Sequence, residues 1–182
     1  MERLLDAGVS DVVSDAANLL ERLYPYPERI TAAGIGAATE FIAAHPSIAY
    51  RQVEPHRPLP FENESFDVAC SNAVIEHVGS RAEQVAFVRE LSRVARRVFL
   101  TAPNRYFPVE HHTALPLVAW TEATFAAACR QTGKSEWADE ANLILMSRSR
   151  LAALCPPGRR MQVGFTGIKL GPFSSNLYLY LE

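Results

Sequence analysis

The sequence FDVACSNAVIEHV, at residues 66–78, decides the fold class of this chain. It begins within an apolar run of strand length, residues 65–71, that predicts a buried β-strand. The next regular segment is 81–95, whose apolar residues recur near helical spacing and predict an amphipathic helix. A strand followed by a helix of this kind is the repeating unit of a parallel sheet with helices on its faces.

The same alternation extends in both directions from this stretch. We expect strands at 3–7, 29–33, 48–53, 65–71, 97–101, 161–170 and 177–181, and helices at 14–23, 37–44, 81–95, 121–131 and 148–154. Ser14 is the expected cap of the first helix, and 171–176 is rich in turn-forming residues. The order predicts an α/β, Rossmann-like fold with a mostly parallel seven-stranded sheet, helices on both faces and an antiparallel C-terminal edge strand.

Composition limits the classes of function. The chain has 182 residues, of which 48% are hydrophobic and 21% charged, which suits one globular domain. A formal net charge of -2 gives no reason to expect nucleic acid or an anionic membrane as partner. Neither a bilayer-spanning stretch nor a signal peptide is evident, and we expect a cytoplasmic protein. The three cysteines are far apart, so neither a disulfide framework nor a zinc knuckle is expected.

The stretch 66–78, preceded by Leu59-Pro60-Phe61, resembles the central segment of class I S-adenosylmethionine-dependent methyltransferases of type 11. Residues 4–8 are similar to the start of that family's first motif, and 101–112 are similar to a segment after strand five in one subgroup. The resemblance implies a single domain, 1–182, without the N-terminal helices that many relatives carry. It also implies S-adenosylmethionine as cofactor and methyl transfer to a small-molecule acceptor.

The expected cofactor site lies at the carboxyl ends of the strands, where open parallel sheets bind ligands. A glycine such as Gly8 allows close approach of backbone to a ligand there. From these positions and the resemblance together, we expect the cofactor-binding residues to be Asp6, Gly8, Ser10, Asp11, Gly36, Glu54, Asn72 and Ala73.

Three of these positions depart from the family pattern. After Gly8 the usual further glycines are replaced, and Asp11 is placed where it could accept a hydrogen bond from the cofactor's ammonium. Gly36 stands where relatives have an acid that binds the ribose hydroxyls, a loss on the order of 1.5–3 kcal/mol for one charge-assisted hydrogen bond. Glu54 can contact the adenine amino group, although it is offset by one residue.

The expected catalytic residues are His77, Glu110 and His112, because a general base is needed if the acceptor loses a proton. The alternative for His77 is a packing or capping role in its loop. A metal site at Glu110-His111-His112 is not expected, because adjacent histidines rarely point the same way and no further ligand stands at metal spacing. An acid–histidine pair of Glu110 and His112 is the favoured interpretation.

Acceptor recognition is expected from Arg105, Tyr106 and Trp120, with a surface aromatic cluster as the alternative. A second hypothesis for the whole chain is a catalytically silent, methyltransferase-like binding or scaffolding protein with a degenerate cofactor site. A dehydrogenase is disfavoured, because the first strand is not followed by G-x-G-x-x-G. The sequence leaves the acceptor and the oligomeric state open, and we consider a homodimer because the usual covering helices are missing.

Overall fold

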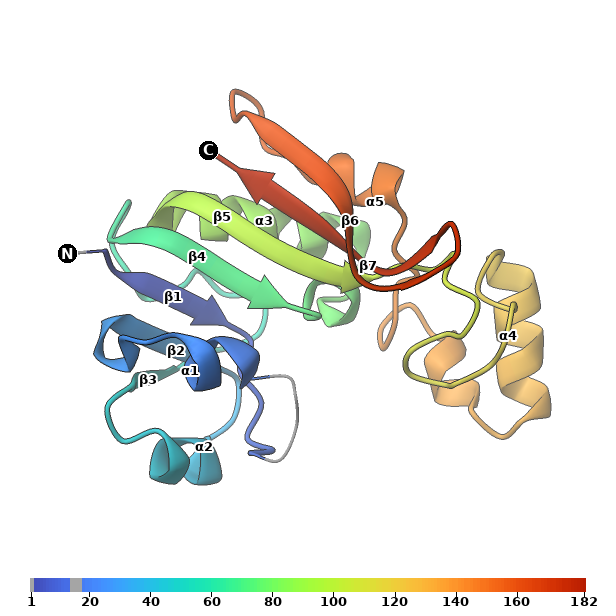
Figure 1. Ribbon diagram of the computed structural model, residues 1–182, viewed down its shortest axis with the longest axis horizontal. Helices are drawn as coiled ribbons and strands as arrows, with labels where there is room; N and C mark the ends of the chain where they lie inside the picture. The colour runs from blue at the N-terminus through green and yellow to red at the C-terminus, as the bar shows by residue number, and fades with distance from the viewer. Residues whose placement is uncertain (1, 14–17) are drawn as a thin grey trace.

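A computed structural model describes residues 2–13 and 18–182 and contains a seven-stranded sheet with helices packed against it (Figure 1). The strands are β1 (Leu4–Ala7), β2 (Ile30–Gly34), β3 (Ala49–Gln52), β4 (Phe66–Asn72), β5 (Ala95–Pro103), β6 (Met161–Leu170) and β7 (Phe173–Leu181). Their order in the sheet is β3-β2-β1-β4-β5-β7-β6. The first five strands pair in parallel, and β7 is antiparallel to both of its neighbours. The predicted fold class is therefore confirmed.

The antiparallel strand β7 lies inside the sheet, and β6 forms the edge. The expected turn at 171–176 was too long, because β7 already begins at Phe173. Its polar side chains are satisfied within the hairpin: Ser174 Oγ donates to Thr166 O at 2.5 Å, and Ser175 Oγ accepts from Ile168 N at 2.9 Å. Turn-forming side chains that bond across the hairpin are thus compatible with a strand.

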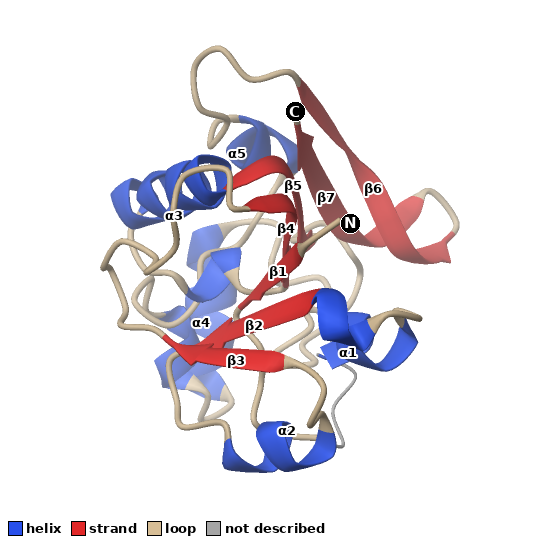
Figure 2. Cartoon of the chain, turned by 90° about the vertical axis from the view of Figure 1, so that its left-hand side faces the viewer, coloured by secondary structure: helices blue, strands red, loops and turns tan. Residues whose placement is uncertain are grey.

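Each predicted helix is present, and α2 to α5 are shorter than the sequence pattern predicted. They are α1 (Leu19–Leu23), α2 (Thr39–Ala44), α3 (Arg81–Val94), α4 (Glu122–Gln131) and α5 (Arg148–Ala152), joined by the 3-10 turns η2 (Pro27–Arg29), η3 (Ile75–His77) and η4 (Ser135–Ala138). The beginning of the first predicted helix, including the Ser14 cap, falls on 14–17 and lies outside the described residues. Figure 2 shows α3 and α5 on one side of the sheet and α1 on the other.

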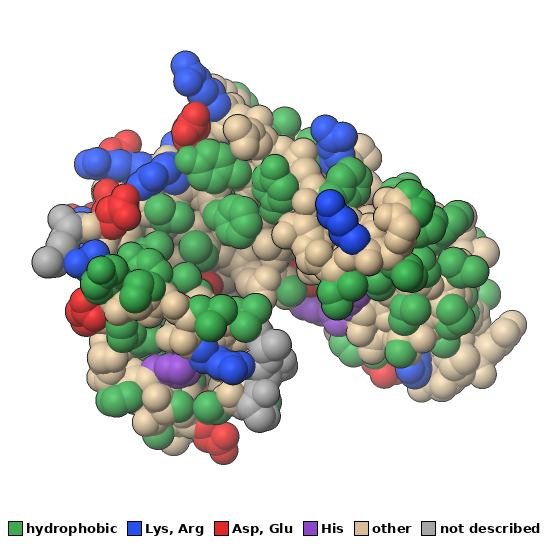
Figure 3. All heavy atoms as spheres, in the orientation of Figure 1, with side chains coloured by type: hydrophobic (Ala, Val, Ile, Leu, Met, Phe, Trp, Pro, Cys, Tyr) green, Lys and Arg blue, Asp and Glu red, His purple; other side chains and the backbone are tan. Residues whose placement is uncertain are grey.

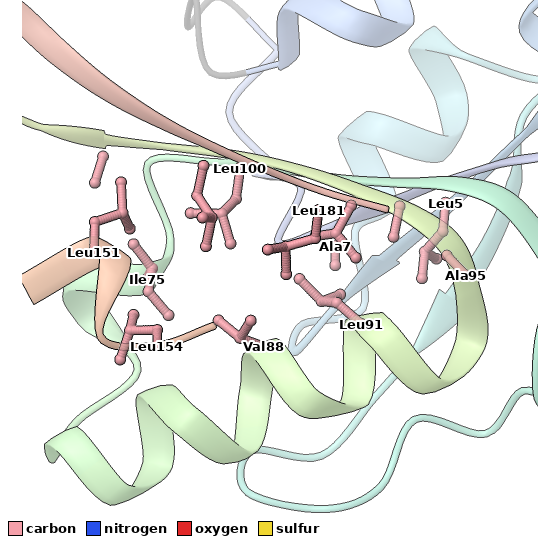
Figure 4. Close-up of a cluster of buried hydrophobic side chains, with 14 of the residues drawn as sticks. Leu5, Ala7, Ile75, Val88, Leu91, Ala95, Leu100, Leu151, Leu154 and Leu181 are labelled. Atoms are coloured by element: carbon pink, nitrogen blue, oxygen red, sulfur yellow. The ribbon is translucent and has the colours of Figure 1, made fainter. Parts of the chain in front are cut away.

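The longest helix, α3, begins with a capping box. Ser80 Oγ accepts from Glu83 N at 3.4 Å, and Ser80 N donates to Glu83 Oε2 at 2.6 Å. The apolar stripe of the helix, including Val88 and Leu91, is fully buried against the strands (Figure 4). Full burial of one such side chain contributes about 1.5–3 kcal/mol to stability.

The other face of the sheet is open over β5 and β7. Val98 and Leu100 are fully buried, whereas Phe99 between them is 39% exposed and stacks on Tyr178 at 6.0 Å between ring centroids. Apolar side chains are visible on this face in Figure 3. Among the described helices, none has the length and apolar character needed to cross a bilayer.

Candidate functional site

The strand order reverses between β1 and β4, and the carboxyl ends of these strands meet the segment that follows β4. Gly8, directly after β1, has a φ of +105°, which favours glycine. A Cβ added to Gly8 would collide with the side chain of Val74. The turn is also held by Ala33 O, which accepts from Gly8 N at 2.8 Å. Only glycine fits this turn, and Val74 occupies the space above it.

The end of β4 places two of the expected cofactor residues. Asn72 is exposed, and its Oδ1 accepts from Thr101 Oγ1 at 2.5 Å. Ala73 has a φ of +53°, so the chain turns sharply there into η3. These residues lie at the same end of the sheet as Gly8, at the carboxyl ends of β1 and β4.

Beyond β2, Gly36 is exposed and has free space around it. A Cβ there would meet no atom closer than 4.0 Å, where Ala38 N lies. The carbonyl of Gly36 accepts from Tyr50 OH at 2.5 Å. The position can therefore take a side chain, although the sequence supplies none.

The other expected cofactor residues have partners within the protein. Asp11 Oδ1 accepts from the amides of Glu40 and Phe41 at 2.9 and 3.0 Å and so caps α2. Ser10 N donates to Asn18 Oδ1 at 3.0 Å. These bonds give Asp11 and Ser10 local structural roles.

Glu54 lies at the protein surface. Its side chain is 80% exposed, and its Oε2 lies 3.7 Å from Arg57 Nε.

Asp6 is buried beneath the turn, next to a second acid from α1. Burial, followed by the charge of Glu21, raises the pKa of Asp6 well above its usual range. Among the described residues, neither carboxylate oxygen of Glu21 has a hydrogen-bond partner. Burial and these two acids also raise the pKa of the Cys70 thiol to about 12, so this thiol stays protonated at neutral pH.

Two histidines from distant segments meet at the carboxyl edge of β4. His77 belongs to η3, His112 belongs to the connection between β5 and α4, and their Nε2 atoms lie 3.0 Å apart. His77 Nδ1 donates to Asn142 O at 2.7 Å, since a carbonyl oxygen can only accept. The ring of His112 also lies against Trp137, with centroids 5.0 Å apart. Histidine side chains gather where the sheet meets the region of α4 (Figure 3).

Glu110 fixes the orientation of His112. Its Oε1 lies 2.9 Å from His112 Nδ1, and its Oε2 accepts from the Thr113 amide at 2.7 Å and the Thr113 hydroxyl at 2.6 Å. Burial alone would raise the pKa of Glu110, but the hydrogen bonds from His112 and Thr113 outweigh it and lower the pKa to about 2. Glu110 is therefore ionised, and His112 Nδ1 is the donor to it.

Glu76 is the third group beside the histidines. Its side chain is 1% exposed, and among the described residues neither of its carboxylate oxygens has a hydrogen-bond partner. Burial raises its pKa to about 7, partly offset by the charge of His112. One ligand atom each from Glu76, His77 and His112 lie within 4.8 Å of one another.

The adjacent histidines diverge, as the sequence analysis assumed. His111 turns towards Phe107, with ring centroids 6.1 Å apart, whereas His112 faces His77. The further potential ligands come from η3, which the sequence analysis did not pair with this segment. The acids and histidines of the cluster therefore belong to two separate parts of the chain.

The residues expected to bind the acceptor differ in burial and in their partners. Arg105 is buried, and its Nη1 lies 2.7 Å from Glu122 Oε1. Tyr106 is 46% exposed and lines an open hollow with Phe165 and Arg148. Trp120, 44% exposed, lies against Phe173 with ring centroids 6.1 Å apart.

The comparisons with known proteins agree with this architecture. Residues 17–98 match the family model described as a methyltransferase domain. A solved S-adenosylmethionine-dependent methyltransferase from Mesorhizobium loti is similar over 98% of this chain and 90% of its own, with a TM-score of 0.64 and 12% identity. The chain has the class I methyltransferase fold. The predicted resemblance to S-adenosylmethionine-dependent methyltransferases is thereby confirmed.

Two further structures share this methyltransferase fold. The complex of DhpI with SAM and HEP matches over 100% of this chain and 78% of its own, with a TM-score of 0.58 and 16% identity. A possible histamine N-methyltransferase from Thermotoga maritima matches over 100% and 82%, with a TM-score of 0.59 and 14% identity. No curated protein matches the sequence.

Sequence reasoning missed Glu76, Asn142 and Arg148. Glu76 directly precedes His77 in the stretch 66–78, and this acid–histidine pair is the sequence signal that could have identified it. Asn142 acts through its backbone carbonyl, for which a residue type gives no signal.

Proposed function

We propose that this chain is an S-adenosylmethionine-dependent methyltransferase that acts on a small-molecule acceptor. The observation that carries the proposal is the cluster of His77, His112 and Glu110 at the carboxyl edge of β4. In an open α/β sheet this edge, beside the point where strand order reverses, is where ligands bind. Groups able to accept a proton thus stand at the place where the fold presents a ligand.

The turn after β1 stands at the carboxyl end of the strand, beside the point where strand order reverses and ligands bind, while the missing side chain of Gly8 makes room for Val74. Gly36 leaves free space beyond β2 for a ribose, but no carboxylate binds its hydroxyls there. We propose that Asp6, Gly8, Ser10, Gly36, Asn72 and Ala73 surround the cofactor, while Asp11 and Glu54 contribute mainly through the local bonds described above. The cofactor supplies an electrophilic methyl group, and its affinity is lower than in relatives that keep the ribose acid.

The protein's part in the reaction is to position the acceptor and take up its proton. Asn142 O and Glu110 hold the Nδ1 protons of His77 and His112, so each neutral ring keeps a lone pair on Nε2. Either Nε2 is then available to an acceptor hydroxyl or amine at this edge. His77 is the more accessible of the two, since it is exposed whereas His112 is half-buried.

For the acceptor we propose the hollow beside Tyr106, which has a volume of about 450 Å³. That volume suits a small molecule. Arg148 adds a positive charge and Phe165 an aromatic face to it. Trp120 is proposed to bind the acceptor only if the acceptor reaches beyond Phe173. Arg105 is proposed to anchor the segment through Glu122 rather than to touch the acceptor, because its guanidinium is buried.

The test is calorimetric titration of the chain with S-adenosylmethionine and with S-adenosylhomocysteine. Saturable binding of either at one equivalent supports the proposal. A folded sample that binds neither at millimolar concentration contradicts it and favours the catalytically silent scaffold instead. Sedimentation of the same sample decides between monomer and homodimer.

A further inference from the structure

The tautomers of His77 and His112 leave two lone pairs facing each other. His77 Nδ1 donates to the Asn142 carbonyl, and His112 Nδ1 donates to Glu110, which also accepts from the Thr113 amide and hydroxyl. Both Nε2 atoms of the neutral rings are therefore unprotonated acceptors. Two acceptors 3.0 Å apart repel each other unless a cation lies between them, either a proton that turns one ring into an imidazolium donor or a metal ion.

The separation of the two nitrogens fits two neighbouring ligands of one metal ion. Imidazole nitrogens bind a divalent transition metal at about 2.0–2.1 Å. Two such bonds at a right angle place the nitrogens about 3.0 Å apart, by simple geometry from that bond length. The observed 3.0 Å between His77 Nε2 and His112 Nε2 equals this value.

Glu76 supplies a third ligand from inside the protein. Its carboxylate is nearly fully buried, and among the described residues neither oxygen accepts a hydrogen bond. A buried carboxylate without a partner is strongly disfavoured, and a bound cation would remove that cost. One of its oxygens lies within 4.8 Å of a ring nitrogen of each histidine, so the three potential ligand atoms lie close together.

The surroundings also have the form of a metal site. Metal-binding histidines commonly donate their second ring nitrogen to a carboxylate or a backbone carbonyl, as His112 does to Glu110 and His77 does to Asn142. A cavity of about 10 Å³ lies beside this cluster, lined by Glu76, Glu110 and His112 but not by His77. That is about the room needed for one water molecule or ion.

We propose that Glu76, His77 and His112 bind one divalent transition-metal ion. Two imidazoles and one carboxylate in neighbouring positions suit Fe²⁺, Co²⁺, Mn²⁺ or Zn²⁺ better than Ca²⁺ or Mg²⁺, which prefer oxygen ligands. Three protein ligands leave coordination positions for water or for an oxygen of the acceptor. With an ion bound, both Nε2 lone pairs are in use, and the ion takes over the activation of the acceptor. Metal binding itself does not depend on methyl transfer.

The test uses tag-free, chelator-treated protein titrated with CoCl₂ and no other ligand, followed by calorimetry and by the visible absorption of Co²⁺. Wild type is expected to bind one equivalent and to develop an absorption band. Removing a ligand in His77→Ala or His112→Ala is expected to weaken binding by more than the ~10–100-fold that loss of an outer partner costs. His111→Ala is the matched control, since His111 is an exposed histidine of the same segment that turns towards Phe107, and it is expected to bind as wild type does.

Circular dichroism melts show whether each variant is folded, and His77→Ala is the safer test because that side chain is exposed. The proposal is overturned if wild type does not bind Co²⁺ saturably, or if a folded His77→Ala binds as well as wild type. It is also overturned if His111→Ala weakens binding as much as His112→Ala, because the ion would then be held by surface imidazoles in general.

Discussion

Nε2 of His77 lies 3.0 Å from Nε2 of His112, although the two residues stand 35 positions apart in the chain. The contact joins η3 to the connection after β5, and each ring is fixed from behind by an acceptor on its Nδ1 side. The site therefore depends on the outer partners as much as on the histidines themselves.

Replacing Glu110 tests this dependence. In Glu110→Gln an amide NH₂, itself a donor, faces groups whose hydrogen bonds the carboxylate accepted, among them the Thr113 amide. We expect Co²⁺ affinity to fall by ~10–100-fold, as for other outer partners of metal ligands. The cobalt titration measures it, and Glu54→Gln is the control because that carboxylate is 80% exposed. Equal affinity in Glu110→Gln and wild type would show that Glu110 does not orient His112.

The free space at Gly36 makes a gain-of-function variant available. In Gly36→Asp the new Cβ meets no atom closer than 4.0 Å, and the variant restores a carboxylate at the position where the family binds the ribose. We expect S-adenosylmethionine to bind about tenfold or more tightly, because one charge-assisted hydrogen bond contributes about 1.5–3 kcal/mol. Calorimetry measures the change, and the isosteric Gly36→Asn separates charge from shape. Unchanged affinity in the aspartate variant would place the ribose elsewhere.

The turn at Gly8 predicts a loss of stability. In Gly8→Ala the new Cβ collides with Val74, and the φ of +105° is unfavourable for alanine. We expect the free energy of unfolding to fall by about 2–5 kcal/mol, from about 1–2 for the backbone and about 1–3 for overpacking. Urea denaturation measures it.

Gly133 provides the control for that variant, since its φ is +73° and no atom lies within 4 Å of an added Cβ. Gly133→Ala is expected to cost only the backbone part, about 1–2 kcal/mol. Equal costs at the two positions would mean that Val74 moves aside freely.

Glu122 gives the protein a dependence on acid. A hydrogen bond from Arg105, with the charges of Arg105 and Arg150, lowers the pKa of Glu122 to about 2. Because the folded-state pKa lies below the unfolded one, this stabilisation is complete above about pH 4.5 and is lost as the pH falls towards about 2. In Glu122→Gln the buried Arg105 lacks its ion pair, so we expect lower stability at neutral pH and a smaller loss on acidification.

Urea denaturation across this pH range measures the difference between the two proteins. Glu28→Gln is the control, since that exposed carboxylate lies 3.9 Å from Arg29 and should leave the acid dependence unchanged. Parallel stability curves for wild type and Glu122→Gln would contradict the prediction.

Much of the sheet could be predicted because local pattern decides it. The strand at 65–71 and the helix at 81–95 agree with β4 and α3 to within a residue or so, since apolar spacing and the Ser80 cap act within a few residues of sequence. The start of β7 was mistaken because the bonds that satisfy Ser174 and Ser175 reach across to β6, and a turn propensity does not register them.

The centre of the site could be predicted only in part. The sequence indicated His77, Glu110 and His112 separately, and the pairing of Glu110 with His112 is local. The meeting of His77 with His112 depends on the path of an irregular connection, for which there is no periodicity to read. The buried, unpartnered state of Glu76 likewise follows from packing alone.

The interior position of β7 sets the order in which the sheet can be completed. The edge strand β6 precedes β7 in the chain, yet its hydrogen-bonding partner in the sheet is β7. When translation has reached residue 170, the whole of β6 has been synthesised but the strand with which it pairs has not. Leu177, Leu179 and Leu181, all fully buried, come from β7 and are synthesised after every other strand of the sheet. The edge of β5 therefore stays unpaired until translation reaches β7. A premature stop codon within residues 173–181 would deprive both β5 and β6 of their shared partner.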